Sequence, residues 1–205
     1  MINTNLTKNI KIEGYADLLN PALKGKIAAA DPAASSSAFE HLVNMLYAMG
    51  DGNPEKGWDY VKKLCANLDG KLLSGSSAVY KGVADGEYAV GLTYEEGGIN
   101  YVVSGSPVKV IYMKEGVISK PEGVYIIKGA KNLENAKKFI DYCVSLDAQN
   151  ILINKVNRRA IRKDAFSSEV VIPMTEIYSI KDDPDFVESN RQKWLDKFRD
   201  IYTGI

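Results

Sequence analysis

Residues 74–98, SGSSAVYKGVADGEYAVGLTYEEGG, place two polar, glycine-containing loops close together, each directly after an apolar run. The stretch reads as a Ser/Gly turn, a short helix, a tight turn, an apolar strand and then Tyr-Glu-Glu-Gly-Gly. Helices alternating with apolar strands are typical of an α/β fold with largely parallel strand pairing. The two loops are open to two interpretations. They are routine helix caps, or they line one ligand cleft.

The same alternation extends on both sides of this stretch. Short apolar runs bounded by turn residues predict strands at 25–32, 71–76, 88–93, 107–113 and 123–128. Apolar residues at helical spacing predict helices at about 35–49, 54–68, 76–85, 95–103, 133–144, 147–154 and 184–202. We therefore predict an α/β lobe, with a mostly parallel sheet flanked by helices. A mainly helical segment follows it from about residue 116.

The composition is that of an ordinary globular chain. Lys and Arg number 26, as do Asp and Glu, so the formal net charge is 0 and no nucleic-acid partner is implied. The first residues, MINTNLTKNI, have no apolar signal core, so we expect no signal peptide in this chain. Cys65 and Cys143 lack metal-binding spacing, and we expect both to be buried on apolar helix faces.

Polar segments follow three predicted strands, at 31–37, 74–77 and 93–98. The carboxyl ends of parallel strands meet at one edge of a sheet, where ligands bind in open α/β folds. Two of the segments begin helices, and a helix start offers free N–H donors that suit a carboxylate, phosphate or phosphonate. Simple capping is the alternative. The candidate anion-binding residues are Ser35, Ser36, Ser37, Ser74, Gly75, Ser76 and Ser77.

The third segment carries different chemistry. Tyr94, Glu95 and Glu96 offer hard oxygen donors, which suit a hard cation or accept hydrogen bonds from ammonium or sugar hydroxyl groups. Alternatively, the two glutamates simply favour the first turn of a helix. His41 is the single histidine, so a histidine-based metal site is excluded and a Ser-His triad is disfavoured. We expect His41 at the surface or at its boundary. Without a catalytic constellation, binding is favoured over catalysis, and an α/β transferase is the weaker alternative.

The order of four segments resembles a known family. They are YADLLNPALKGKIAAADPAASSSAF (15–39), residues 74–98 quoted above, PVKVIYMKEGV (107–117) and PEGVYIIKGAKNLENAKKFIDYCVSLDAQ (121–149). Together they resemble the extracellular solute-binding proteins of ABC importers, in the ferric-iron and phosphonate type branch (type II periplasmic binding proteins). The similarity is strong over about residues 2–160 and loose beyond.

The resemblance implies two α/β lobes around a cleft, joined by crossing strands at a hinge. Residues 1–14 would be the first crossing and 15–115 the ligand-binding lobe 2. Residues 116–205 would supply the return crossing strand and the C-terminal helices of lobe 1. The first segment of lobe 1 and the signal peptide have no counterpart in this sequence. We therefore expect the helix faces of Phe139, Ile140, Trp194 and Phe198 to pack on lobe 2 or to pair with a second copy, as a homodimer or swapped dimer.

The resemblance also implies the function. It assigns solute capture for ABC permease subunits, without enzymatic activity or a resident cofactor, at an extracytoplasmic site that is periplasmic or lipid-anchored. The implied ligand is an anionic organic compound such as a phosphonate or phosphate ester, or ferric iron. The ligand-binding residues carried over are Ser35, Ser36, Ser37, Ser74, Gly75, Ser76, Ser77, Tyr94 and Glu95. Iron-binding members have two adjacent tyrosines here. Glu95 replaces the second, so a metal-handling protein using Tyr94 and Glu95 is the alternative.

Overall fold

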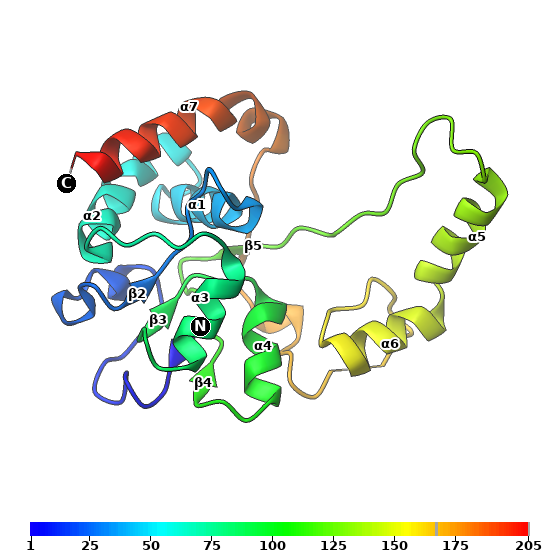
Figure 1. Cartoon of the computed structure of the whole chain (residues 1–205), viewed down its shortest axis with the longest axis horizontal. Helices are drawn as coiled ribbons and strands as arrows, with labels where there is room; N and C mark the ends of the chain where they lie inside the picture. Colours follow the sequence, from blue (N-terminus) through cyan, green and yellow to red (C-terminus); the bar gives the residue numbers. More distant parts are fainter. Residues whose placement is uncertain (167, 205) are drawn as a thin grey trace. The chain divides into compact units, whose positions relative to one another are not determined.

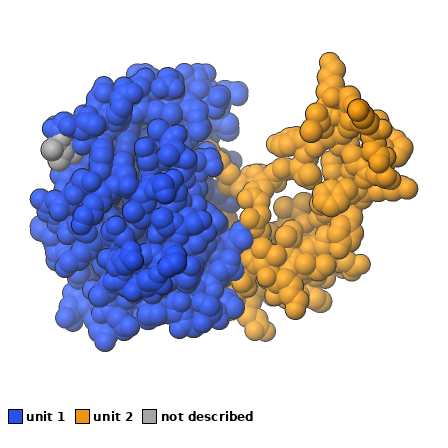
Figure 2. All heavy atoms as spheres, viewed as in Figure 1, with its two compact units in different colours: residues 1–119, 175–205 blue, residues 120–174 orange. Residues whose placement is uncertain are grey.

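The computed structural model describes residues 1–166 and 168–204, which divide into two compact units. Unit 1 comprises residues 1–119 and 175–205, and unit 2 comprises residues 120–174 (Figure 2). The expected boundary near residue 115 falls close to the end of the first stretch of unit 1. Residues 175–205, which we had grouped with the segment from 116 onward, lie in unit 1.

A mixed sheet forms the centre of unit 1 (Figure 1). Strand β2 (Ile27–Ala28) pairs in parallel with β3 (Val90–Gly91), and β1 (Ile2–Asn3) pairs antiparallel with both β3 and β4 (Val108–Lys109). It follows that β2, β3 and β4 all run in one direction and that β1 alone runs against them. The strand predicted at 71–76 is reduced to a parallel bridge between Ala30 and Leu73.

Helices cover both faces of this sheet. Successive side chains of a strand point to opposite faces, so each face is apolar and packs in its own cluster. Ile27 and Val90 belong to the larger cluster, which includes residues of three helices, α1 (Ser36–Met49), α2 (Trp58–Leu68) and α7 (Pro184–Thr203). Ala28 belongs to the smaller cluster, with residues of α3 (Ser76–Ala84). Helix α4 (Glu95–Val103) packs beside α3 and against β4. This layering confirms the α/β fold class.

Glycine is required where α3 meets the sheet. A Cβ atom at Gly91 would lie 2.7 Å from Val83 Cγ2 and 3.0 Å from Val79 Cγ1. Val79 and Val83 are fully buried on the inner face of α3. The sequence YAVGLT therefore combines a buried strand with a glycine, whose lack of a Cβ atom lets α3 approach the strand.

A polar anchor fixes the segment that follows β4. The buried Asn44 donates to Tyr15 Oη at 2.8 Å and to the carbonyl oxygen of Gly116 at 3.1 Å, and it accepts from Ile118 N–H at 2.6 Å. Strand β5 (Val117–Ile118) begins there and pairs in parallel with β6 (Ser179–Ile180). This pairing returns the chain to unit 1 just before α7.

Unit 2 contains helices α5 (Leu133–Cys143) and α6 (Leu146–Val156), both as predicted. Ser145 caps α6 by accepting from Ala148 N–H, and the buried Gln149 donates to the carbonyl oxygen of Cys143 at 2.8 Å. The predicted strand at 123–128 is wrong. Tyr125 is 86% exposed there, and no described strand pairs with this segment. An apolar run becomes a strand only where another strand accepts its hydrogen bonds.

Short 3-10 helices at Ala16–Leu19, Pro21–Leu23, Pro54–Gly57 and Met174–Glu176 complete the structure. Both cysteines are free thiols. Cys65 is buried as expected, but Cys143 is only half-buried, because no residue of α5 is fully covered. Within the described ranges, no helix is long and apolar enough to cross a membrane.

Candidate ligand-binding site

Three helices of unit 1, α2, α3 and α4, begin without a side-chain cap. Helix α2 continues directly from the 3-10 helix Pro54–Gly57, whose own start is capped by Asn53, so α3 and α4 are the two that start from a loop. The residue before α3 is Gly75, with extended backbone, and the residue before α4 is Tyr94, and neither side chain caps its helix. The first N–H groups of a helix have no partner inside the helix, so they are the donors that a ligand would use. For these two helix starts, the structure does not support the routine capping interpretation.

Tyr80 connects the two helix starts. Its hydroxyl lies 3.0 Å from Ser77 Oγ, and its ring meets the Tyr94 ring edge to face, with ring centroids 6.0 Å apart. A Cβ atom at Gly97 would lie 2.6 Å from Tyr80 Cδ1, so glycine in the first turn of α4 makes room for this ring. Our sequence analysis missed Tyr80. Its i+3 spacing from Ser77 is the signal that could have identified it.

The start of α4 also carries a fixed carboxylate. Tyr112 donates from its hydroxyl to Glu95 Oε1 at 2.5 Å, and both side chains are half-buried. Thr93, one residue before the helix cap, has a buried hydroxyl oxygen with no hydrogen-bond partner in the described structure. Our sequence analysis also missed Thr93 and Tyr112. Tyr112 lies 17 residues from Glu95, so only the folded sheet brings them together.

The start of α1 is built differently. Ser35 accepts from Ala38 N–H at 3.4 Å and caps the helix, and its hydroxyl lies 3.1 Å from that of Ser37. The preceding turn lies beside the loop before α3, because Asp31 N–H donates to the carbonyl oxygen of Leu73 at 3.0 Å. The three predicted polar segments thus follow neighbouring strands, but the Ser35 hydroxyl already serves its own helix. Ser36 and Ser74 are exposed.

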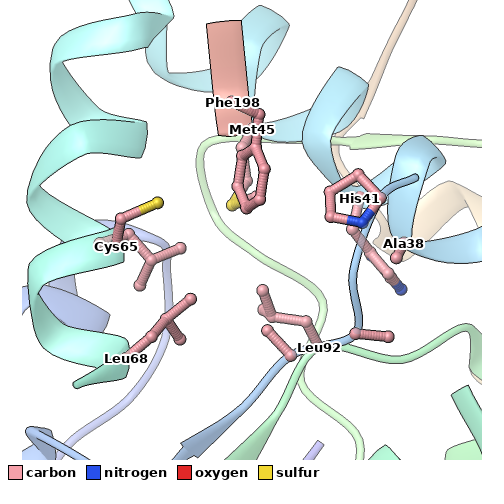
Figure 3. Close-up of a pocket in the computed structure, with 11 residues that line it drawn as sticks. Ala38, His41, Met45, Cys65, Leu68, Leu92 and Phe198 are labelled. Atoms are coloured by element: carbon pink, nitrogen blue, oxygen red, sulfur yellow. The ribbon is translucent and has the colours of Figure 1, made fainter. Parts of the chain in front are cut away.

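His41 faces a separate cavity of about 20 Å³ between α1, α2, α7 and the sheet (Figure 3). The residue is half-buried, as expected at a boundary, but its Nε2 atom is fully buried and has no partner among the described residues. Burial lowers the pKa of His41 to about 4 and raises the pKa of the Cys65 thiol to about 12. The lining is otherwise apolar, so this cavity of one-water size is a packing defect and not the ligand site.

A search of the described residues for clustered metal ligands gives a negative result. In the part of the chain that the structure describes, no three His, Cys, Asp or Glu residues come together as metal ligands. The oxygen donors of Tyr94 and Glu95 therefore remain the candidate metal ligands.

Comparison with known proteins identifies the family. The family model for bacterial extracellular solute-binding proteins matches residues 1–186. The chain belongs to this family. Its members are described as extracellular proteins that bind solutes.

Solved structures show the same fold in other members. The chain is 27% identical to the periplasmic binding protein AfuA from Actinobacillus pleuropneumoniae, solved with fructose 6-phosphate bound, with a TM-score of 0.85. The match covers 98% of this chain and 65% of AfuA. A ferric binding protein from Campylobacter jejuni is 23% identical with a TM-score of 0.64, over 99% of this chain and 66% of that one. At that identity the second match shows the fold alone.

A curated relative is also longer than the part of it that this chain matches. An uncharacterized protein of Haemophilus influenzae is 29% identical over 137 residues, which is 67% of this chain and 38% of the relative. The chain thus spans less than two thirds of the length of AfuA and of this relative.

Proposed function

We propose that this chain provides the ligand-receiving part of a solute-binding protein and that it takes a phosphate ester at the starts of α3 and α4. The observation that carries the proposal is the pair of helix starts without side-chain caps, joined through Ser77, Tyr80 and Tyr94. Such a start presents N–H donors and about half a positive charge, which suits a phosphate group. The fructose 6-phosphate bound to AfuA supports a sugar phosphate as the ligand class.

The candidate ligand-binding residues of this proposal are Ser74, Gly75, Ser76, Ser77, Tyr94 and Glu95, together with Thr93 and Tyr80. Ser35, Ser36 and Ser37, at the start of α1, are the alternative position for the phosphate. Closure of two lobes over the ligand would complete the site. A receptor with micromolar affinity has about 8 kcal/mol of binding free energy, and half of that corresponds to roughly millimolar affinity. We therefore expect this chain alone to bind sugar phosphates at roughly millimolar concentrations.

We further propose that the complete receptor delivers its solute to ABC permease subunits and works outside the cytoplasmic membrane, in a periplasm or held by a lipid anchor. Family membership supports this proposal, and the family is described as extracellular.

The test is a titration of the wild-type chain with fructose 6-phosphate, followed by NMR, alongside two matched aspartate variants. Ser76→Asp adds a negative charge to the first turn of α3 and should weaken binding at least tenfold, because a repulsion of about 1.4 kcal/mol has that effect. Ser36→Asp adds the same charge at the same helical position of α1 and should change affinity by less than twofold. Loss of binding in Ser36→Asp alone would move the phosphate to α1, and a wild-type chain that does not bind would contradict the proposal.

Ferric iron is the second candidate ligand, favoured by one observation. Tyr94 and Glu95 are adjacent at the start of α4, and a phenolate with a carboxylate is a hard donor pair. Addition of ferric citrate to the chain should then produce a tyrosinate charge-transfer colour that Tyr94→Phe abolishes. A colourless mixture would contradict the iron proposal and leave the phosphate ester as the ligand.

A further inference from the structure

The hydrogen bond between Tyr112 and Glu95 fixes a negative charge at the start of α4. Tyr112 follows strand β4, and Glu95 is the first residue of α4, which packs against that strand. A Cβ atom at Gly98 would lie 2.7 Å from Val110 Cγ2, so the glycine allows helix and strand to approach closely. This close approach brings the Tyr112 hydroxyl to 2.5 Å from Glu95 Oε1.

A phenol that donates to a carboxylate makes a short, charge-assisted hydrogen bond. It holds the Glu95 side chain in the first turn of α4, where the helix dipole also favours a negative charge. Helix α3 differs, because its first turn contains no acidic residue and carries serine hydroxyls instead. The two helix starts of the candidate site therefore have opposite character. One is suited to an anion, and the other already holds a carboxylate that accepts hydrogen bonds.

We infer that Tyr112 is a positioning residue for ligand specificity, which fixes Glu95 as the acceptor for hydroxyl groups while the anionic group of the same ligand lies at the start of α3. This inference rests on the proposed function and narrows its ligand class. The site should take compounds with a single phosphate and a hydroxyl-bearing body. It should select against inorganic phosphate, which offers no sugar hydroxyls, and against bisphosphates, whose second phosphate would meet Glu95.

The test compares Tyr112→Phe with the wild-type chain, using fructose 6-phosphate and inorganic phosphate as probes in NMR titrations. The variant removes one hydroxyl and keeps the ring. Affinity for fructose 6-phosphate should fall by about tenfold, the effect of losing one well-placed hydrogen bond. Affinity for inorganic phosphate should change by less than twofold. Tyr88→Phe is the control, because it makes the same chemical change beside Gly82, in the C-terminal half of α3 and away from the helix start. It should alter neither affinity.

Glu95→Gln gives a second, independent arm, because it keeps the size of the side chain and removes its charge. Fructose 1,6-bisphosphate should bind the variant more tightly than the wild-type chain, by about tenfold if one unscreened repulsion of about 1.4 kcal/mol is relieved. Equal affinity of the two proteins for the bisphosphate would overturn the role of Glu95 in selection.

Failure of this inference can be told apart from failure of the proposed function. An equal fall for both probes in Tyr112→Phe, or no fall for either, would overturn the positioning role while the function stands. A wild-type chain that binds neither probe would contradict the function. In that case the role of Tyr112 is still decided without ligand, by the order parameter of the Glu95 side chain measured by ¹³C relaxation. This order parameter should be lower in Tyr112→Phe than in the wild-type chain, and an unchanged value would overturn the inference.

Discussion

At the scale of single residues, the site combines features that the sequence shows with others that only folding creates. Serine, glycine and acidic residues beside apolar runs located the helix starts correctly, because the rules that govern such starts are local. Tyr80 and Tyr112 were not predicted, since their partners depend on how α3 and β4 pack against α4. For Ser35, the sequence did not distinguish two roles. Its position before a helix fits ligand binding as well as capping, and in the structure its hydroxyl caps α1.

His41 makes unfolding depend on pH. Its pKa is about 4 in the folded chain and about 6.5 when unfolded, so the unfolded state binds more protons between these values. The stability contributed by neutral His41 is fully present above about pH 6.5 and is lost as the pH falls towards 4, by about 3 kcal/mol in all. Urea unfolding at pH 7.5 and pH 4.5 should show a smaller difference for His41→Gln than for wild type. The same difference in both proteins would contradict this account.

At the scale of elements, helix prediction succeeded and strand prediction was weaker. Each predicted helix is present, because amphipathic spacing and end signals lie within the helix itself. The apolar run at 123–128 lacks a partner strand, and sequence alone cannot show whether a partner is present. The apolar face of α7 was expected to need another surface to pack on. In the structure α7 packs on α2, with Trp194 fully buried and the Lys197 ammonium group above the Trp58 ring.

The packing of α7 predicts a large contrast between two aromatic side chains. Trp194 is 0% exposed in the large apolar cluster, whereas Phe139 in α5 is 61% exposed. Trp194→Ala should lower the free energy of unfolding by about 3–5 kcal/mol, the usual cost of removing a buried aromatic ring. Phe139→Ala should stay within about 0.5 kcal/mol of wild type. Urea unfolding measures both, and similar effects of the two substitutions would show that α7 does not pack as described.

At the scale of the whole molecule, the two units differ in how much apolar surface they bury. Among the residues of unit 2 that the structure describes, the buried apolar ones are few, namely Ala148, Ile153 and Val171, and α5 has no buried residue. Unit 1 contains both apolar clusters. A small unit with so little core has little stability of its own. The expectation that these apolar faces pair with a second copy stays a prediction.

This difference should appear in hydrogen exchange. Amides of α5 and α6 should exchange much faster than amides of α1 and α2, because local opening of unit 2 exposes little additional apolar surface. Mass spectrometry of exchanged peptides, at a protein concentration low enough to keep the chain monomeric, measures this directly. Protection of α5 equal to that of α1 would mean that another surface covers it, and native mass spectrometry would show whether that surface is a second copy.

The most direct test of the central claim is a residue-by-residue NMR map of the chain during titration with fructose 6-phosphate. The account predicts that the backbone amides of Ser76, Ser77, Tyr94 and Glu95 shift together, with one dissociation constant that is roughly millimolar. The chemical shifts of the α5 and α6 amides should not change. Shifts confined to other regions, or none at all at saturating ligand, would contradict the claim that the starts of α3 and α4 form the ligand-receiving edge.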